Sequence, residues 1–158
     1  MKSNILFSLF SVLLGLTFVS CDKDNDADTT KPVIKLEEPA DGEVLRIGGD
    51  VHFEAEFSDD VMLGSYLVEI HSNFDGHSHK APSSRATSEE VPFFFKKSYD
   101  LSGKRNSHEH HHDIVIPENT KPGNYHFMVY CTDAAGNQTL VSREVVLSHD
   151  AEEHHHED

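Results

Sequence analysis

A nine-residue segment near the middle of the chain combines several side chains that bind metal ions. It reads His71-Ser-Asn-Phe-Asp-Gly-His-Ser-His79 and carries three imidazoles and the carboxylate of Asp75. Imidazole nitrogens and carboxylate oxygens are typical ligands of zinc and related transition metals. His77 and His79 are two residues apart, so in an extended chain they project to the same side, about 7 Å apart. The segment therefore predicts a site for zinc, with nickel or copper as alternatives.

A second cluster of histidines follows about thirty residues later, in the sequence His108-Glu-His-His-His-Asp113. Its alternate members share one face of an extended strand, in phase with Ile114 and Ile116. These members are His108, His110 and His112. We expect a second metal site here, with Asp113 or Glu109 as a further ligand. If the strand began only near His112, the preceding loop could instead join the first site.

The remaining histidines have different interpretations. His52 is isolated from the clusters, and we interpret it as a solvated surface residue. The chain closes with residues 149–158, which contain three consecutive histidines among acidic residues. We expect this segment to be a disordered tail that binds metal weakly.

The segments that must position these ligands have the pattern of short β-strands. Apolar and polar residues alternate in residues 51–57, 66–71 and 125–131, as in half-buried strands. Further strands are expected at residues 33–36, 93–99, 108–116 and 140–147. No stretch of convincing length has the period of a helix. About seven short strands separated by turns predict an all-β, immunoglobulin-like antiparallel β-sandwich over residues 32–148.

The expected sandwich brings distant histidines together. In the immunoglobulin strand order, residues 66–71 and 125–131 form antiparallel neighbours, and the end of the first lies beside the start of the second. The outward-facing positions there are occupied by His71 and His126. The loop after His71 could fold back onto this pair. The predicted ligand set is therefore His71, Asp75, His77, His79 and His126.

The N-terminal residues are expected to export and anchor the protein. Residues 1–20 have a positive start and an apolar stretch too short for a mature transmembrane helix, as in a signal peptide. They end in Phe18-Val19-Ser20-Cys21, which resembles a bacterial lipobox, so we expect Cys21 to be lipidated. Residues 21–31 are polar and acidic and form the expected flexible tether. This predicts a lipid anchor in the outer membrane, facing the periplasm or the cell surface.

Charge and cysteine content exclude several classes of protein. The chain has 28 acidic and 13 basic residues and a net charge of −15 with neutral histidines. This balance argues against nucleic-acid binding, which needs clustered lysine and arginine, and favours binding of cations. The second cysteine, Cys131, has no partner once Cys21 is acylated, so no disulfide framework is expected.

The segment from Pro122 to Asn137 reads Pro-Gly-x-Tyr … Thr-Asp-x-x-Gly-Asn and resembles the last hairpin of bacterial immunoglobulin-like domains. We expect Tyr125 to pack the corner of the sandwich. Asp133 is expected to stabilise the turn through its side chain, with calcium binding as the alternative.

Three motifs together resemble a known family. They are Ile-His-x-Asn-Phe-Asp-Gly-His-x-His at residues 70–79, a histidine-rich strand before Ile-x-Ile-Pro at 114–117, and Gly-x-Tyr-His … Asp-x-x-Gly-Asn at 123–137. They resemble small histidine-rich lipoproteins of Bacteroidetes-type bacteria with an immunoglobulin-like domain of unknown function. The resemblance covers about residues 31–147. It implies the sandwich fold and the association of the histidine regions, and it supplies no activity.

These residues bear on three classes of function. The leading prediction is a non-catalytic, zinc-binding envelope lipoprotein for metal capture, buffering or sensing, with an envelope transporter or surface protein as partner. Its affinity should fall below about pH 6.5, because imidazole binds metal only when neutral. The alternative is an interaction or adhesion module, or an accessory subunit of a glycan system. An enzyme is not expected, because no HExxH helix, nucleophile elbow or phosphate loop is present.

Overall fold

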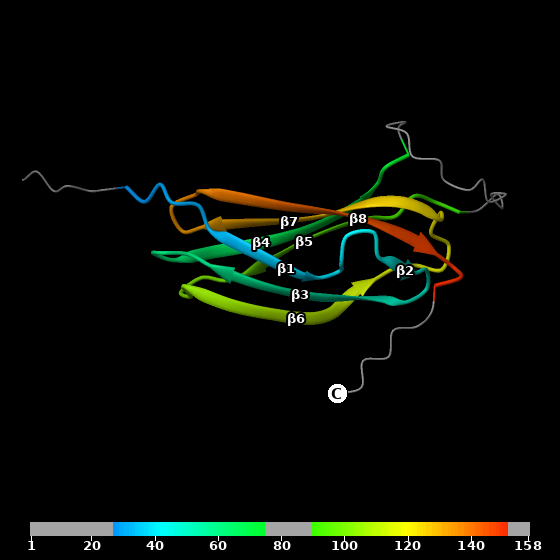
Figure 1. Ribbon diagram of the computed structural model, residues 1–158, viewed down its shortest axis with the longest axis horizontal. Helices are drawn as coiled ribbons and strands as arrows, with labels where there is room; N and C mark the ends of the chain where they lie inside the picture. Colours follow the sequence, from blue (N-terminus) through cyan, green and yellow to red (C-terminus); the bar gives the residue numbers. More distant parts are fainter. Residues whose placement is uncertain (1–26, 75–89, 152–158) are drawn as a thin grey trace, which may run out of the picture.

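The computed structural model describes residues 27–74 and 90–151, in which every regular element is a β-strand (Figure 1). The strands are β1 (Val33–Glu38), β2 (Val44–Arg46), β3 (Asp50–Ser58), β4 (Leu63–Ser72), β5 (Phe94–Asp100), β6 (Asn106–Val115), β7 (Gly123–Asp133) and β8 (Gln138–Ser148). The seven strands expected from the sequence are all present. The short strand β2 is additional, and its three residues are too few to show an alternating pattern.

The strands form two sheets that pack face to face (Figure 1). One sheet has the order β1-β3-β6, and the other has the order β2-β8-β7-β4-β5. All neighbours are antiparallel except β2 and β8, which run parallel. Strands β3 and β6 in one sheet, and β4 and β7 in the other, correspond to the B–E and C–F pairs of the immunoglobulin fold. This topology confirms the predicted all-β sandwich.

The core consists of the inward-facing side chains of both sheets. In β3 these are Val51, Phe53, Ala55 and Phe57, each at most 1% exposed. Strands β4 and β7 contribute alternate residues in the same way, since successive side chains of a strand point to opposite faces. The intervening polar residues, including the histidines of β3, β4 and β7, therefore lie on the outer faces.

Tyr125 stabilises the corner before β7, as the sequence predicted. Its side chain is fully buried, and its hydroxyl donates a hydrogen bond to the carbonyl of Lys121, four residues upstream, at 2.7 Å. The same hydroxyl accepts a hydrogen bond from the backbone N–H of Phe93 at 3.2 Å. This arrangement is the tyrosine corner of immunoglobulin-like sandwiches.

A β-bulge in β6 corrects one prediction about the second histidine cluster. Val51 pairs with Ile114, but Phe53 pairs with His111, so β6 contains one extra residue at this point. A bulge of this kind interrupts the alternation of side chains. As a result, His112 lies on the outer face whereas Ile114 is fully buried. The expectation that His112 is in phase with Ile114 is wrong.

Two further observations concern the described part of the chain. Within residues 27–74 and 90–151, no helix is long and apolar enough to cross a membrane. Cys131 is a free, buried thiol in the core. Burial raises the pKa of this thiol to about 12, and the nearby carboxylates of Asp59 and Asp133 contribute to the shift.

Candidate metal centre

The first predicted site is partly described by the structure. His71 in β4 and His126 in β7 are direct cross-strand partners on the outer face of the five-stranded sheet. Their ring centroids are 5.4 Å apart, and His71 Nδ1 lies 3.3 Å from Glu69 Oε1. The predicted proximity of the two histidines is confirmed. Their role as metal ligands stays a prediction.

The other residues of that prediction lie outside the described part of the chain. They are Asp75, His77 and His79. The expected lipidation site Cys21 and the expected signal peptide at residues 1–20 also lie outside it. Among residues 27–74 and 90–151, no third histidine, cysteine or carboxylate completes a cluster with His71 and His126. The first site therefore depends on the segment that follows β4.

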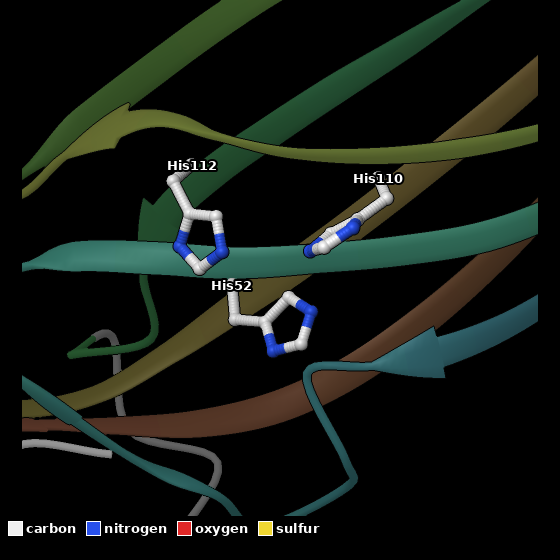
Figure 2. Close-up of side chains that lie close together, drawn as sticks. All are labelled: His52, His110 and His112. Carbon is white, nitrogen blue, oxygen red and sulfur yellow. The ribbon is translucent and has the colours of Figure 1, made fainter. Parts of the chain in front are cut away.

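Three other histidines converge on the outer face of the three-stranded sheet. One ring nitrogen from each of His52, His110 and His112 lies within 4.8 Å of the other two. The ring centroid of His52 is 4.7 Å from that of His110 and 4.9 Å from that of His112. The ring centroids of His110 and His112 are 5.4 Å apart. Figure 2 shows the rings of His110 and His112 reaching toward that of His52. We call these three residues the histidine triad.

The triad follows from the pairing of β3 with β6. His52 lies in the outward phase of β3, between the buried residues Val51 and Phe53. His110 pairs with Glu54, two residues further along β3, so it is a diagonal neighbour of His52. The bulge in β6 places His112 opposite His52, where the regular register is interrupted.

Two carboxylates lie beside the triad, and one of them orients the ring of His112. His112 Nδ1 and Asp50 Oδ2 are hydrogen-bonded at 2.8 Å, which leaves His112 Nε2 as the nitrogen available to an ion. Glu54 Oε2 lies 3.8 Å from His52 Nε2. Metal-binding histidines usually bond their second nitrogen to a carboxylate in this manner, which fixes the tautomer and the ring orientation. The negative charges of Asp50 and Glu54 also favour a cation at this face.

The structure corrects the interpretation of His52 as a solvated residue. Its side chain is only 17% exposed, because the rings of His110 and His112 pack against it. A signal was available in the sequence, since His52 lies in the outward phase of its strand and the immunoglobulin strand order places that strand beside the histidine-rich one. Its two partners lie about sixty residues away, so short-range spacing could not reveal them.

The other proposed members of the second site are directed elsewhere. His108 Nε2 lies 2.9 Å from Glu54 Oε1 and is not part of the triad. Glu109 bonds to Lys104 at 3.0 Å. Asp113 accepts a hydrogen bond from Tyr99 at 2.9 Å and also pairs with Lys97.

The adjacent His111 faces the interior rather than the triad. Its Nε2 is hydrogen-bonded to the hydroxyl of Tyr66 at 2.9 Å, and its Nδ1 lies 2.6 Å from Asp113 Oδ1. The ring stacks on Phe53 and Tyr99. Burial lowers the pKa of His111 and raises that of Tyr66. His111 is therefore an aromatic member of the core edge.

The two groups of histidines cannot share one ion. The triad lies on the outer face of the β1-β3-β6 sheet, whereas His71 and His126 lie on the outer face of the other sheet. The two sheets pack face to face (Figure 1), and the core side chains between them separate these outer faces. Because β6 begins at Asn106, His108 to His112 belong to the strand, and no loop carries them to the first site.

The fold and the site together define an immunoglobulin-like β-sandwich module with a histidine cluster on one outer face. The chain belongs to the DUF4625 family, a domain of unknown function, whose family model matches residues 19–148. A search of curated proteins finds no match.

The solved structures to which this chain is similar include the fibronectin(III)-like modules of Clostridium thermocellum CbhA. The identity is 16%, the TM-score is 0.44, and the match covers 81% of this chain and 53% of that chain. A mutant β-glucosidase of Listeria innocua in complex with laminaribiose matches at 12% identity and a TM-score of 0.32. That match covers 74% of this chain and 16% of the enzyme. This chain thus spans about half of the first structure and a small part of the second.

Proposed function

We propose that this protein is a non-catalytic, metal-binding module of the cell envelope that takes zinc or a similar divalent transition metal. The histidine triad carries the proposal, because three imidazoles from two paired strands present nitrogens within 4.8 Å of one another. Three histidines with an open fourth position form a recognised zinc ligand set. Small rotations of the exposed His110 and His112 rings would bring their nitrogens to zinc-binding distances of about 2.0–2.1 Å.

The surroundings of the triad suit capture of an ion rather than chemistry on a substrate. The site lies on the outer face of a sheet, where His112 has a side chain 50% exposed to solvent. The net charge of −15 raises the local concentration of cations. Lipidation at Cys21 would hold the module at the outer membrane, where an envelope transporter or another surface protein would receive the ion.

A second candidate function is an interaction module without a specific metal site. The observation that favours it is the exposed aromatic side chain of Phe94, which is 63% exposed on the edge strand β5. Its neighbours Phe93 and Phe95 pack into or against the core. A single exposed ring at an open sheet edge could contact a protein or glycan partner.

Calorimetric titration with zinc distinguishes the two functions. The parent is the full chain in which alanine replaces the tail histidines His154, His155 and His156. We expect a stoichiometric component with submicromolar affinity, weakened by at least about 100-fold in His52→Ala, since even loss of a ligand's hydrogen-bonded partner costs 10–100-fold. The matched control His108→Ala removes an outward histidine of β6, the strand that carries His110 and His112, and should retain that component.

The outcomes separate the functions as follows. A second equivalent that disappears in a His71→Ala/His126→Ala variant would support the site on the opposite sheet. Weak and equal binding by the parent and by His52→Ala would mean that the histidines form a solvated surface. The interaction module would then be the better account of the protein.

A further inference from the structure

A cluster of carboxylates lies at the end of the sandwich where the chain enters β1, far from the histidine triad. One carboxylate oxygen from each of Asp28, Asp59 and Asp133 lies within 4.8 Å of the other two. Asp28 precedes β1, Asp59 directly follows β3, and Asp133 ends β7. In Figure 1 these three places meet at the left end of the molecule.

Two of the three aspartates are removed from solvent. Asp59 is 9% exposed and Asp133 is 4% exposed. Asp59 Oδ1 accepts hydrogen bonds from the backbone N–H groups of Val61 and Met62, at 3.0 and 2.7 Å. In contrast, Asp59 Oδ2 is buried, and no donor reaches it within the described residues. A buried carboxylate oxygen without a partner is costly, so a cation at this position would be strongly stabilising.

Within the described residues, no basic side chain forms an ion pair with these carboxylates. Asp133 is instead held by Asn137, whose backbone N–H and side-chain amide donate to its two oxygens at 2.8 and 2.7 Å. Hydrogen bonds to the charged form keep the pKa of Asp133 low against the effect of burial. The carboxylates of Asp59 and Asp133 also help to raise the pKa of Cys131 behind them. Asp133 therefore stays ionised at neutral pH despite its burial.

We propose that Asp28, Asp59 and Asp133 bind a calcium ion. Calcium takes oxygen ligands at 2.3–2.6 Å, so two ligands on opposite sides of the ion are about 4.8 Å apart. Carboxylates spaced within this limit can enclose calcium with little movement, whereas magnesium would require them to draw closer. The absence of imidazole and thiolate from the cluster disfavours zinc.

The site would fasten the N-terminal segment to the sandwich. The backbone carbonyl of Asp28 already accepts a hydrogen bond from Asn137 at 3.0 Å, and Thr30 bonds to Asp60 at 3.2 Å. A calcium ion would add a link from Asp28 to the ends of β3 and β7. Calcium would thereby fix the orientation of the sandwich relative to the segment that precedes β1.

Thermal unfolding of the full chain tests the proposal. We expect 2 mM calcium to raise the melting temperature by about 5–10 °C relative to a chelator, because an ion that binds only the folded state stabilises it. In Asp59→Asn the shift should vanish. Asp41→Asn, which alters an exposed aspartate of the β1–β2 loop, should keep it.

Two additions make the test decisive. Asp28→Asn should also lose most of the shift, and it remains informative if Asp59→Asn does not fold. His52→Ala should retain the full calcium shift, which separates this site from the proposed zinc site. The proposal is overturned if calcium produces no shift, if Asp28→Asn retains the full shift, or if magnesium at 2 mM produces an equal one.

Discussion

Asp50 offers a quantitative test of how the histidine triad binds its ion. Its Oδ2 lies 2.8 Å from His112 Nδ1, so it orients the ring and places a negative charge behind it. An ion bound to His112 Nε2 would be about 7 Å from this carboxylate, given the width of the ring and a zinc–nitrogen distance of about 2.1 Å. Asp50→Asn keeps a hydrogen-bond acceptor and removes the charge. Asp50→Ala removes both.

The expected losses of affinity can be separated. Asp50 and His112 have side chains 53% and 50% exposed, so the dielectric constant of water is appropriate. A unit charge and a divalent ion about 7 Å apart then interact by about 1 kcal/mol, or about five-fold in affinity at low salt. Screening at 0.15 M reduces this to about two-fold. Asp50→Ala also frees the ring, and the total loss should be about 10–100-fold.

Zinc titrations at low and at 0.15 M ionic strength, in the background without tail histidines, measure both effects. The control is Glu56→Gln, which alters another outward carboxylate of β3 that pairs with Lys35 at 3.3 Å. It lies four residues, or about 13 Å, from His52, beyond the screening length at 0.15 M, and at that ionic strength it should change affinity by less than about two-fold. Equal affinity of Asp50→Ala and the parent would refute the role of Asp50 and the position of the ion beside His112.

Two further predictions concern the sandwich itself. Tyr125→Phe removes both hydrogen bonds of a buried hydroxyl and should destabilise the fold by about 2–3 kcal/mol in urea denaturation, because two backbone groups lose their partner. Tyr130→Phe, whose half-buried hydroxyl makes one long contact to sulfur, should change stability by less than about 0.5 kcal/mol, and similar losses in both variants would contradict this. Burial raises the pKa values of Tyr66, Tyr99 and Tyr125 above the ordinary 10. Their contribution to the free energy of unfolding should therefore be fully present below pH 10 and be lost as the pH rises above it. Tyrosinate absorbance from these three residues should appear together with unfolding, and their ionisation near pH 10 in the folded protein would be the opposite result.

Much of the fold was predictable because the alternation of apolar and polar residues reports directly which side of a strand is buried. This pattern located the strands around Phe53, Val68 and Val129. The order of strands in an immunoglobulin-like sandwich then placed His71 beside His126 correctly. The corner formed by Tyr125 was predictable from the local sequence, because the carbonyl that accepts its hydrogen bond lies only four residues upstream.

The histidine triad was not predicted, for two physical reasons. His52 meets its partners only through the pairing of β3 with β6, and the prediction applied the strand order to β4 and β7 alone. In addition, the bulge in β6 shifts the phase between His112 and Ile114, and no residue type at this point of the sequence indicates that a bulge is present. The cluster of Asp28, Asp59 and Asp133 was not predicted for a similar reason. The local sequence identifies Asp133 as a turn residue, whereas Asp28 and Asp59 approach it only in the folded chain.

The central claim is that zinc binds among His52, His110 and His112. Crystals of the full chain grown with zinc, and diffraction data collected on both sides of the zinc absorption edge, would locate the ion directly. We predict an anomalous peak about 2.1 Å from one nitrogen of each of the three rings. A peak confined to other residues, or no peak beside the triad, would contradict the account.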